Sequence, residues 1–309
     1  MKSEFMLSVV IPIYNEELNI VELNSRIGLA LGNVKNYEII FVDDGSTDGT
    51  LQMIKNLADG NSRIKFLSFS RNFGHQNALR AGLEFATGDC VVSMDGDLQH
   101  PPELIVRMIE KWQEGFEIVY TIRKDCEKIS FIKRKTANIF YKLMSTLSDV
   151  NIPQGAADFR LLDKKIVEII MKMNENNLFL RGLVSWVGFN QFAIEYEPEA
   201  RFAGKTKYSL RKMISLAING ITSFSIKPLR LATILGSVIA VFSFIYGFYA
   251  IYIKVFTDEA MSGWTSLLVS VLFLAGIQLL TFGIMGEYIG KLFMESKRRP
   301  SFIIKEKNI

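Results

Sequence analysis

The sequence has few cysteines and little net charge, and charged residues lie near its start. Only Cys90 and Cys126 occur in 309 residues, so no disulfide framework is expected, and a reducing compartment is the simpler interpretation. The formal net charge of +4 is too small to indicate a nucleic-acid partner. Lys2 and Glu4 lie in the first six residues and the next apolar run stops at Pro12, which predicts no cleaved signal peptide.

Hydrophobic residues are abundant, at 49%, and they are concentrated near the C-terminus. Residues 231–253 and 264–286 contain no charged residue. Each run is long enough to cross a bilayer as a helix, which takes about 20 residues. Two such runs joined by a short loop predict a transmembrane hairpin rather than buried core helices. Small residues along both runs would allow close helix packing, so we expect a homo-oligomer formed through these helices.

Charges around the two runs predict their orientation. Basic residues flank the outer ends of the runs, whereas the loop between them carries Asp258 and Glu259 beside Lys254. The positive-inside rule therefore places both termini on the cytoplasmic side of the plasma (inner) membrane. Apolar residues between 210 and 224 recur at helical spacing, which predicts an amphipathic helix on the membrane surface. The expected domains are a cytoplasmic domain (1–209), this juxtamembrane helix (210–230), two transmembrane helices (231–290) and a basic cytoplasmic tail (291–309).

The N-terminal part alternates apolar runs with helical patterns. The expected strands are Leu7 to Ile13, Glu38 to Val42, Ile64 to Phe69 and Cys90 to Met94. The expected helices are Leu18 to Leu31, Thr50 to Ala58 and Gln76 to Ala86. This alternation predicts an α/β fold with a mostly parallel sheet, in which ligands bind beyond the carboxyl ends of the strands.

Polar residues follow each of the four expected strands, and the fourth strand ends in Asp95-Gly96-Asp97. Such residues also cap helices and form turns, so each position alone is ambiguous. In extended geometry, residues i and i+2 point the same way, so Asp95 and Asp97 could face one ion. Paired carboxylates suit Mg²⁺ or Mn²⁺, which in turn bind the oxygens of a substrate phosphate.

Several stretches in order resemble the inverting family 2 glycosyltransferases, which have a GT-A fold. These stretches are VVIPIYNEE (9–17), FVDDGSTDGT (41–50), SFSRNFGHQNALRAG (68–82), MDGDLQHPPE (94–103), GAADFRLLDKK (155–165), FLRGLVSWVG (179–188) and RFAGKTKYS (201–209). The resemblance continues through the second apolar run. Within the family it is strongest for polyprenyl-phosphate glycosyltransferases, in particular the bactoprenol glucosyltransferase branch, which is related to the dolichol-phosphate mannose synthases.

The resemblance implies a role for each matching residue. The expected nucleotide-binding residues are Pro12, Tyr14, Asn15, Glu16, Asp43, Asp44 and Asp95. Asp95 and Asp97 are expected to bind the metal on the donor diphosphate, and Asp158 matches the carboxylate usually proposed as catalytic base. The expected ligands of the diphosphate and acceptor phosphate are Gln99, Arg201, Lys205 and Lys207. Relatives often have Lys where this chain has His75, so any charge at that position is expected to vary with pH.

Acceptor chemistry argues for a limited role of Asp158. A phosphate monoester has a second pKa of roughly 6, so its attacking oxygen is already anionic near neutral pH. We therefore expect Asp158 mainly to orient a basic partner or the sugar, and Asp158→Asn to retain substantial turnover at pH 8. His100 and the two prolines after it are expected to end the metal turn and begin the next helix, and His100 is not expected to bind metal.

The sequence therefore predicts transfer of a hexose to undecaprenyl phosphate at the cytoplasmic leaflet. The favoured sugar is glucose, with UDP-glucose as the donor. The same reaction with GDP-mannose, a UDP-N-acetylhexosamine or a UDP-aminopentose remains open. A flippase is an expected partner for the lipid product. The alternatives are a non-catalytic subunit that binds nucleotide sugars, and a transporter, although two spans without an intramembrane charge offer no evident pathway.

Overall fold

The computed structural model describes residues 4–124, 153, 155–173, 180–199, 222, 225–256 and 263–309. The strands are β1 (Met6–Ile13), β2 (Asn36–Asp43), β3 (Ile64–Phe69), β4 (Cys90–Ser93), β5 (Ile118–Arg123), β6 (Ala156–Asp163), β7 (Gln191–Tyr196) and β8 (Ile304–Lys307). The helices are α1 (Ile20–Ala30), α2 (Thr50–Gly60), α3 (His75–Phe85), α4 (Leu104–Gln113), α6 (Lys164–Met171), α7 (Leu180–Trp186), α9 (Lys227–Phe256) and α10 (Trp264–Ser296). The four strands expected from the sequence are present, with ends shifted by no more than two residues.

One sheet contains all the described strands, in the order β7-β5-β6-β4-β1-β2-β3-β8. β1 pairs in parallel with β2 and β4, and β2 pairs in parallel with β3, whereas β6 and β8 run antiparallel to their neighbours. The prediction of a mostly parallel α/β fold is therefore confirmed. The strand order reverses between β1 and β4, which is the point where such sheets bind ligands.

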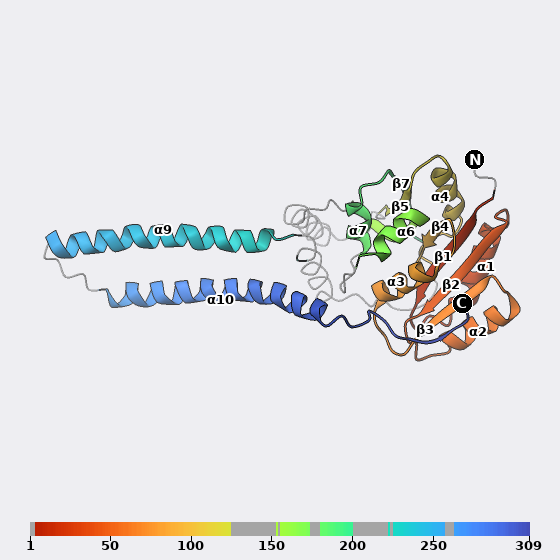
Figure 1. Ribbon diagram of the computed structural model, residues 1–309, viewed down its shortest axis with the longest axis horizontal. Coiled ribbons are helices and arrows are strands. Elements are labelled where there is room, and N and C mark those ends of the chain that lie inside the picture. Colours follow the sequence, from red (N-terminus) through yellow and green to blue (C-terminus); the bar gives the residue numbers. More distant parts are fainter. Residues whose placement is uncertain are drawn as a thin grey trace.

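Both faces of the sheet are covered because its central strands are apolar on both sides (Figure 1). Val9 and Ile11 pack with α1, α2 and α4 on one face, whereas Val10 packs with α3 on the other, as the twofold period of a strand requires. α6 and α7 lie on the same face as α3. These two cores fix the strand ends that carry the polar site residues.

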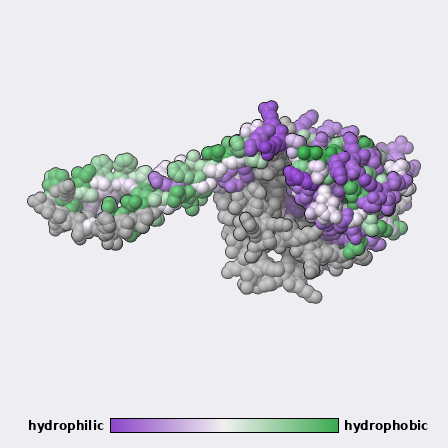
Figure 2. Space-filling view, turned by 90° about the horizontal axis from the view of Figure 1, so that it is seen from below, coloured by the Kyte–Doolittle hydropathy of each residue, from purple (hydrophilic) through white to green (hydrophobic). Residues whose placement is uncertain are grey.

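α9 and α10 form a long antiparallel hairpin that projects from the α/β domain (Figure 1). Residues 227–253 and 269–296 are long and apolar enough to cross a membrane, and the most apolar part of each contains no residue that is buried within the structure. Figure 2 shows hydrophobic side chains along the hairpin and mainly hydrophilic ones on the α/β domain. Residues 227–230, expected in a juxtamembrane helix, belong to α9, and most of that expected helix lies outside the described residues.

The C-terminal segment differs from the expected basic tail, because it joins the sheet. β8 pairs antiparallel with β3, and the Phe302 ring stacks on Phe69 with centroids 5.1 Å apart. The Asn308 side chain accepts a 2.6 Å hydrogen bond from the backbone N–H of Phe66. The chain thus returns from the hairpin to the edge of the sheet, and residues 304–307 of the expected tail form a strand of the α/β domain.

Candidate active site

The acidic turn after β4 fits closely against β1. A Cβ atom added at Gly96 would lie 2.2 Å from Cδ1 of Ile13, so a larger residue cannot occupy this position without movement. Leu98 is buried and has a φ of 60°, a left-handed conformation that closes the turn. The backbone N–H of Gln99 donates to Oδ1 of Asp97 over 3.2 Å. These contacts hold Asp95 and Asp97 at the carboxyl end of β4.

The loops after β1 and β2 are joined by hydrogen bonds. Asn15 has a φ of 53°; its N–H donates to Ser46 Oγ over 3.0 Å, and its side chain accepts from the Thr47 N–H over 2.8 Å. The N–H of Glu16 donates to Thr50 Oγ1 over 3.0 Å. The structure therefore brings the predicted nucleotide-binding loop into contact with the loop after β2.

Two buried carboxylates, Asp43 and Asp44, hold the neighbouring loops in place. Asp43 accepts from the Ser46 N–H and from Ser68 Oγ. Asp44 accepts from the N–H groups of Phe73 and Gly74, at 2.6 and 2.9 Å, and Gly74 has a φ of 99° that favours glycine. Burial raises the pKa of Asp44, although the Phe73 and Gly74 N–H groups oppose this rise. Asp44 thereby fixes the loop that leads into His75.

Asp158 lies at the start of β6 and is surrounded by basic side chains. Arg181, near the start of α7, donates to both Asp158 oxygens, with both distances at 2.8 Å. The Arg160 guanidinium donates to the same carboxylate over 3.2 Å. Nε2 of His75 lies 3.6 Å from Asp158 and 3.4 Å from Asp95, so His75 connects the basic cluster to the acidic turn.

These contacts determine the charge states. Burial alone would raise the pKa of Asp158, but Arg181, His75 and Arg160 outweigh it and hold this pKa well below its usual range. Burial likewise opposes charge on His75, but Asp158 and Asp95 raise its pKa to about 9. Asp158 is therefore an anion near neutral pH and a weak proton acceptor, and His75 is a cation throughout the neutral range.

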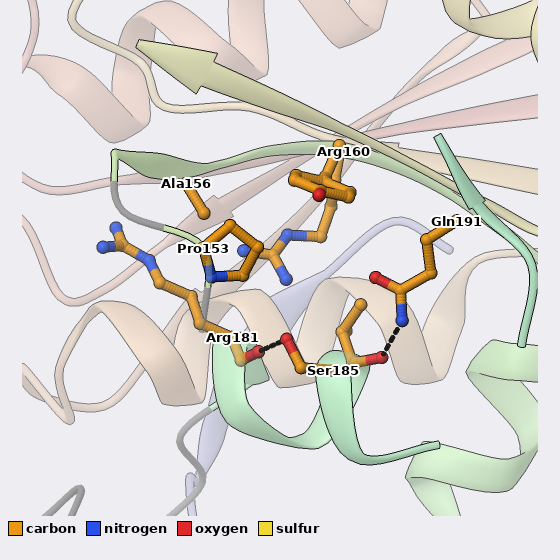
Figure 3. Close-up of a pocket in the computed structure, with 8 residues that line it drawn as sticks. Pro153, Ala156, Arg160, Arg181, Ser185 and Gln191 are labelled. Carbon is orange, nitrogen blue, oxygen red and sulfur yellow. Dashed lines mark hydrogen bonds between the residues drawn. The ribbon is translucent and has the colours of Figure 1, made fainter. Parts of the chain in front are cut away.

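A small cavity lies beside this cluster, between β6 and α7 (Figure 3). Its wall includes Arg160, Arg181, Ser185 and Gln191. Ser185 Oγ donates to the carbonyl of Arg181, and the Gln191 amide donates to the carbonyl of Val184. Nε of Arg160 is buried and donates to no group among the described residues.

Comparison with known sequences identifies the family. The sequence profile described as "Glycosyl transferase family 2" matches residues 8–170, and the profile of the "GtrB C-terminal hairpin" matches residues 227–292. The chain belongs to glycosyl transferase family 2. This confirms the resemblance inferred from the motifs, and the protein is a membrane-anchored glycosyltransferase with a GT-A-like α/β domain.

The relatives are similar over nearly their whole length. The "Uncharacterized glycosyltransferase YkcC" of Bacillus subtilis is 46% identical and aligns with 99% of this chain and 95% of its own. The "Prophage bactoprenol glucosyl transferase homolog" of Escherichia coli is 44% identical over 97% of this chain and 98% of its own. The "Bactoprenol glucosyl transferase" of Shigella phage SfV has the same identity and the same coverage.

The donor set of the acidic turn fits a divalent cation. Oδ1 of Asp95 is buried and accepts no hydrogen bond from the described residues, although Nε2 of His75 lies 3.4 Å from it. Asp97 adds a second carboxylate two positions later. Within the described ranges, no third acidic, histidine or cysteine residue joins them in a metal-binding group. An ion on two carboxylates would complete its coordination with substrate phosphate oxygens and water, which is typical of Mg²⁺ in this kind of site.

The remaining predicted site residues have mixed outcomes. The side chain of Gln99 accepts from Arg123 over 3.5 Å, and its carbonyl accepts from the Glu199 N–H over 3.3 Å. Pro12 is within β1, and Tyr14 follows that strand directly. Arg201, Lys205 and Lys207 lie outside the described residues.

Residue-by-residue reading of the sequence did not find the basic partners of Asp158. Arg160 and Arg181 lie in the apolar stretches DFRLL and LRGLV, and both are at or near the buried core. A charged residue inside an apolar stretch needs a partner of opposite charge when it is buried. That signal could have led to both arginines, but not to the identity of their partner.

Proposed function

We propose that this family 2 enzyme transfers glucose from UDP-glucose to a polyprenyl phosphate, with inversion at the sugar's C1 atom. One observation carries the proposal: the acidic turn of Asp95 and Asp97 lies beside a cationic cluster, which consists of His75, Arg160 and Arg181. The domain that contains both is attached to a hairpin of two exposed apolar helices. The named bactoprenol glucosyl transferases among its relatives, which align over nearly the whole chain, support glucose as the sugar and a polyprenyl phosphate as the acceptor.

The reaction is a single displacement. An oxygen of the lipid phosphate attacks C1 of glucose, the bond from C1 to the β-phosphate oxygen breaks, and UDP leaves with that electron pair. Near neutral pH the acceptor oxygen needs no base, because its second pKa is roughly 6. Asp95 and Asp97 would hold a divalent cation, which would supply charge stabilisation for the departing diphosphate.

Charge around Asp158 suits two anionic substrates. The Asp158 carboxylate holds Arg181 through two hydrogen bonds and thereby fixes the direction of a guanidinium beside His75. Arg181, Arg160 and His75 contact Asp158, and His75 also contacts Asp95, so three cations face two carboxylates and the cluster is positive before the substrates bind. In the proposed mechanism Asp158 orients these cations, and the cations reduce the repulsion between the donor diphosphate and the acceptor phosphate.

The loops after β1 and β2 provide the nucleotide site in this proposal. Its residues are Pro12, Tyr14, Asn15, Glu16, Asp43, Asp44 and Asp95. Asp43 and Asp44 contribute through the loops that they hold, since their carboxylates already accept internal hydrogen bonds. The proposal assigns Gln99 to binding of the diphosphate. It assigns binding of the donor and acceptor phosphates to Arg201, Lys205 and Lys207.

The proposed membrane arrangement has both ends of the hairpin in the cytoplasm. Lys227 and Arg230 lie at the start of α9, while Lys297, Arg298 and Arg299 follow α10, which matches the positive-inside rule. Apolar side chains exposed along both helices provide surfaces for lipid and for a second copy of the chain. Because the sugar would be added on the inner leaflet, a flippase must carry the lipid product across.

Transfer of radiolabelled sugar into organic-extractable lipid tests the proposal. Full-length protein in detergent receives undecaprenyl phosphate, Mg²⁺ or Mn²⁺, and one labelled donor: UDP-glucose, GDP-mannose or a UDP-N-acetylhexosamine. We expect lipid label from UDP-glucose that is lost with EDTA. Label from another donor alone would refute the assignment of glucose, and nucleotide-sugar binding without any lipid label would support a non-catalytic subunit.

Asp97→Asn is the matched variant for this assay. The asparagine oxygen keeps the acceptor for the Gln99 N–H, but the negative charge is lost. We expect transfer to fall about 10²–10³-fold, the effect of losing a few kcal/mol of transition-state stabilisation by the ion. Exposed Asp59→Asn removes the same charge away from the site and should leave the rate unchanged.

A further inference from the structure

His100 lies beneath the acidic turn and contacts it directly. It is buried, and it follows Asp97 by three residues, immediately before the two prolines that lead into α4. Its Nδ1 atom accepts a 3.2 Å hydrogen bond from the backbone N–H of Asp95. Because Nδ1 is the acceptor, the ring carries its hydrogen on Nε2, which lies 3.8 Å from Asp95 Oδ2, beyond hydrogen-bond distance.

The ring of His100 is held from two other elements. It stacks on Phe159 of β6, with centroids 5.1 Å apart and an interplanar angle of 16°. Tyr196, the last residue of β7, meets it edge to face, with centroids 5.9 Å apart. Phe159 directly follows Asp158, so one imidazole connects the acidic turn to the strand that carries the basic cluster.

We propose that His100 is a positioning residue, which sets the direction of the Asp95 carboxylate for the divalent cation through the backbone of Asp95. This inference rests on the proposed role of Asp95 as a metal ligand. The stacking fixes where Nδ1 lies, and Nδ1 fixes the Asp95 N–H and hence the start of the turn. His100 touches neither ion nor substrate in this role. If His100 served only to fill the core, an aromatic ring without a hydrogen-bond acceptor would suffice. If it positions Asp95, the Nδ1 acceptor is required.

Two substitutions separate the acceptor from the ring. In His100→Asn, the side-chain oxygen can take the place of Nδ1, but the aromatic contacts are lost. In His100→Phe, the stacking on Phe159 is kept, but the Asp95 N–H loses its acceptor. Packing alone therefore ranks Phe above Asn, and positioning through the acceptor ranks Asn above Phe.

The test measures Mn²⁺ binding to the full-length protein with UDP present, from the electron paramagnetic resonance signal of free Mn²⁺, beside thermal unfolding. We expect His100→Phe to bind Mn²⁺ about tenfold more weakly, the effect of leaving one donor unpaired, and His100→Asn to stay within about threefold of the parent. We expect the unfolding temperatures to rank in the opposite order. Mn²⁺ affinities that rank with thermal stability, or that do not change in His100→Phe, would overturn the proposal.

A measurement on the unsubstituted ring covers the case in which His100→Phe does not fold. The chain has two histidines, so ¹⁵N-histidine labelling gives two rings, and His75→Asn leaves His100 alone. The expected spectrum shows a non-protonated Nδ1 and a protonated Nε2; hydrogen on Nδ1 would overturn the proposal. Because neither experiment needs a lipid acceptor, failure of lipid glucosylation would contradict the proposed function without affecting these results.

Discussion

Replacing Asp158 by Asn should damage stability more than catalysis. The carboxylate is almost fully buried and accepts two 2.8 Å hydrogen bonds from Arg181 and one of 3.2 Å from Arg160. Asparagine keeps the shape but leaves those cations and His75 without their shared anion. Breaking a buried ion pair costs about 3–5 kcal/mol, and we expect about 3 kcal/mol because Arg181 is 31% exposed and can be rehydrated. The unfolding temperature of the catalytic domain should fall by roughly 6–12 °C.

The pH dependence of this loss follows from the low pKa of Asp158. Arg181, His75 and Arg160 lower this pKa in the folded state against the effect of burial. The stabilisation is then complete above the unfolded pKa of about 3.9 and is lost only as pH falls through the lower folded value. Thermal unfolding should therefore show the full deficit of Asp158→Asn between about pH 5 and 6.5. The deficit should shrink as pH rises toward 9, because Asp158 helps to raise the pKa of His75 to about 9 and the parent loses this contribution as His75 deprotonates. The two proteins should also converge in strong acid.

Turnover decides between an orienting carboxylate and a base. At pH 8, well below the unfolding temperature, Asp158→Asn should keep more than about a tenth of the parental kcat, because the acceptor needs no deprotonation. Loss of a true general base costs about 10²–10⁴-fold. A decrease in that range at pH 8, in protein that is still folded and binds UDP, would refute the reasoning. Asp59→Asn is the exposed control for both measurements.

Three further predictions concern the turn, the tail and the acceptor. Gly96→Ala should impair Mn²⁺-dependent UDP binding and destabilise the domain by about 1–3 kcal/mol, because its Cβ meets Cδ1 of Ile13; Ile13→Val removes that atom and should restore binding. Deleting residues 302–309 should lower the unfolding temperature and promote aggregation, because it removes β8 and exposes the edge of β3; size-exclusion chromatography and thermal unfolding check this. In a pH–rate profile, the transfer rate of the parent should decrease at low pH with the second pKa of the acceptor phosphate, about 6, and Asp158→Asn should show the same decrease.

The central fold could be predicted because its strands are long apolar runs. β1 and β2 are buried on both faces, so neither needs a distant partner to be recognised. β8 could not be found in this way. It has four residues, IKEK, of alternating burial, and its partner β3 lies more than 200 residues earlier in the chain. Its pairing depends on where α10 returns the chain, which local sequence does not encode.

Within the site, positions that depend on local sequence were easier to predict than contacts between distant segments. Asp95 and Asp97 form a turn whose spacing is visible in the sequence. The partner of Asp158 is Arg181, which lies 23 residues away on a different element. Only the packing of α7 against the sheet brings these two residues together. The hydrogen bond from Asp95 to His100 spans five residues, yet the ring contacts of His100 with Phe159 of β6 and Tyr196 of β7 depend on the fold.

The most direct test of inverting transfer to lipid phosphate is the anomeric configuration of the product. Full-length protein would be incubated with UDP-α-glucose, a divalent cation and undecaprenyl phosphate, and the purified lipid product examined by ¹H and ³¹P NMR. The account predicts glucose linked through a phosphodiester in the β configuration. An α-linked product would contradict the single displacement, and free glucose without a glycolipid would contradict the lipid acceptor.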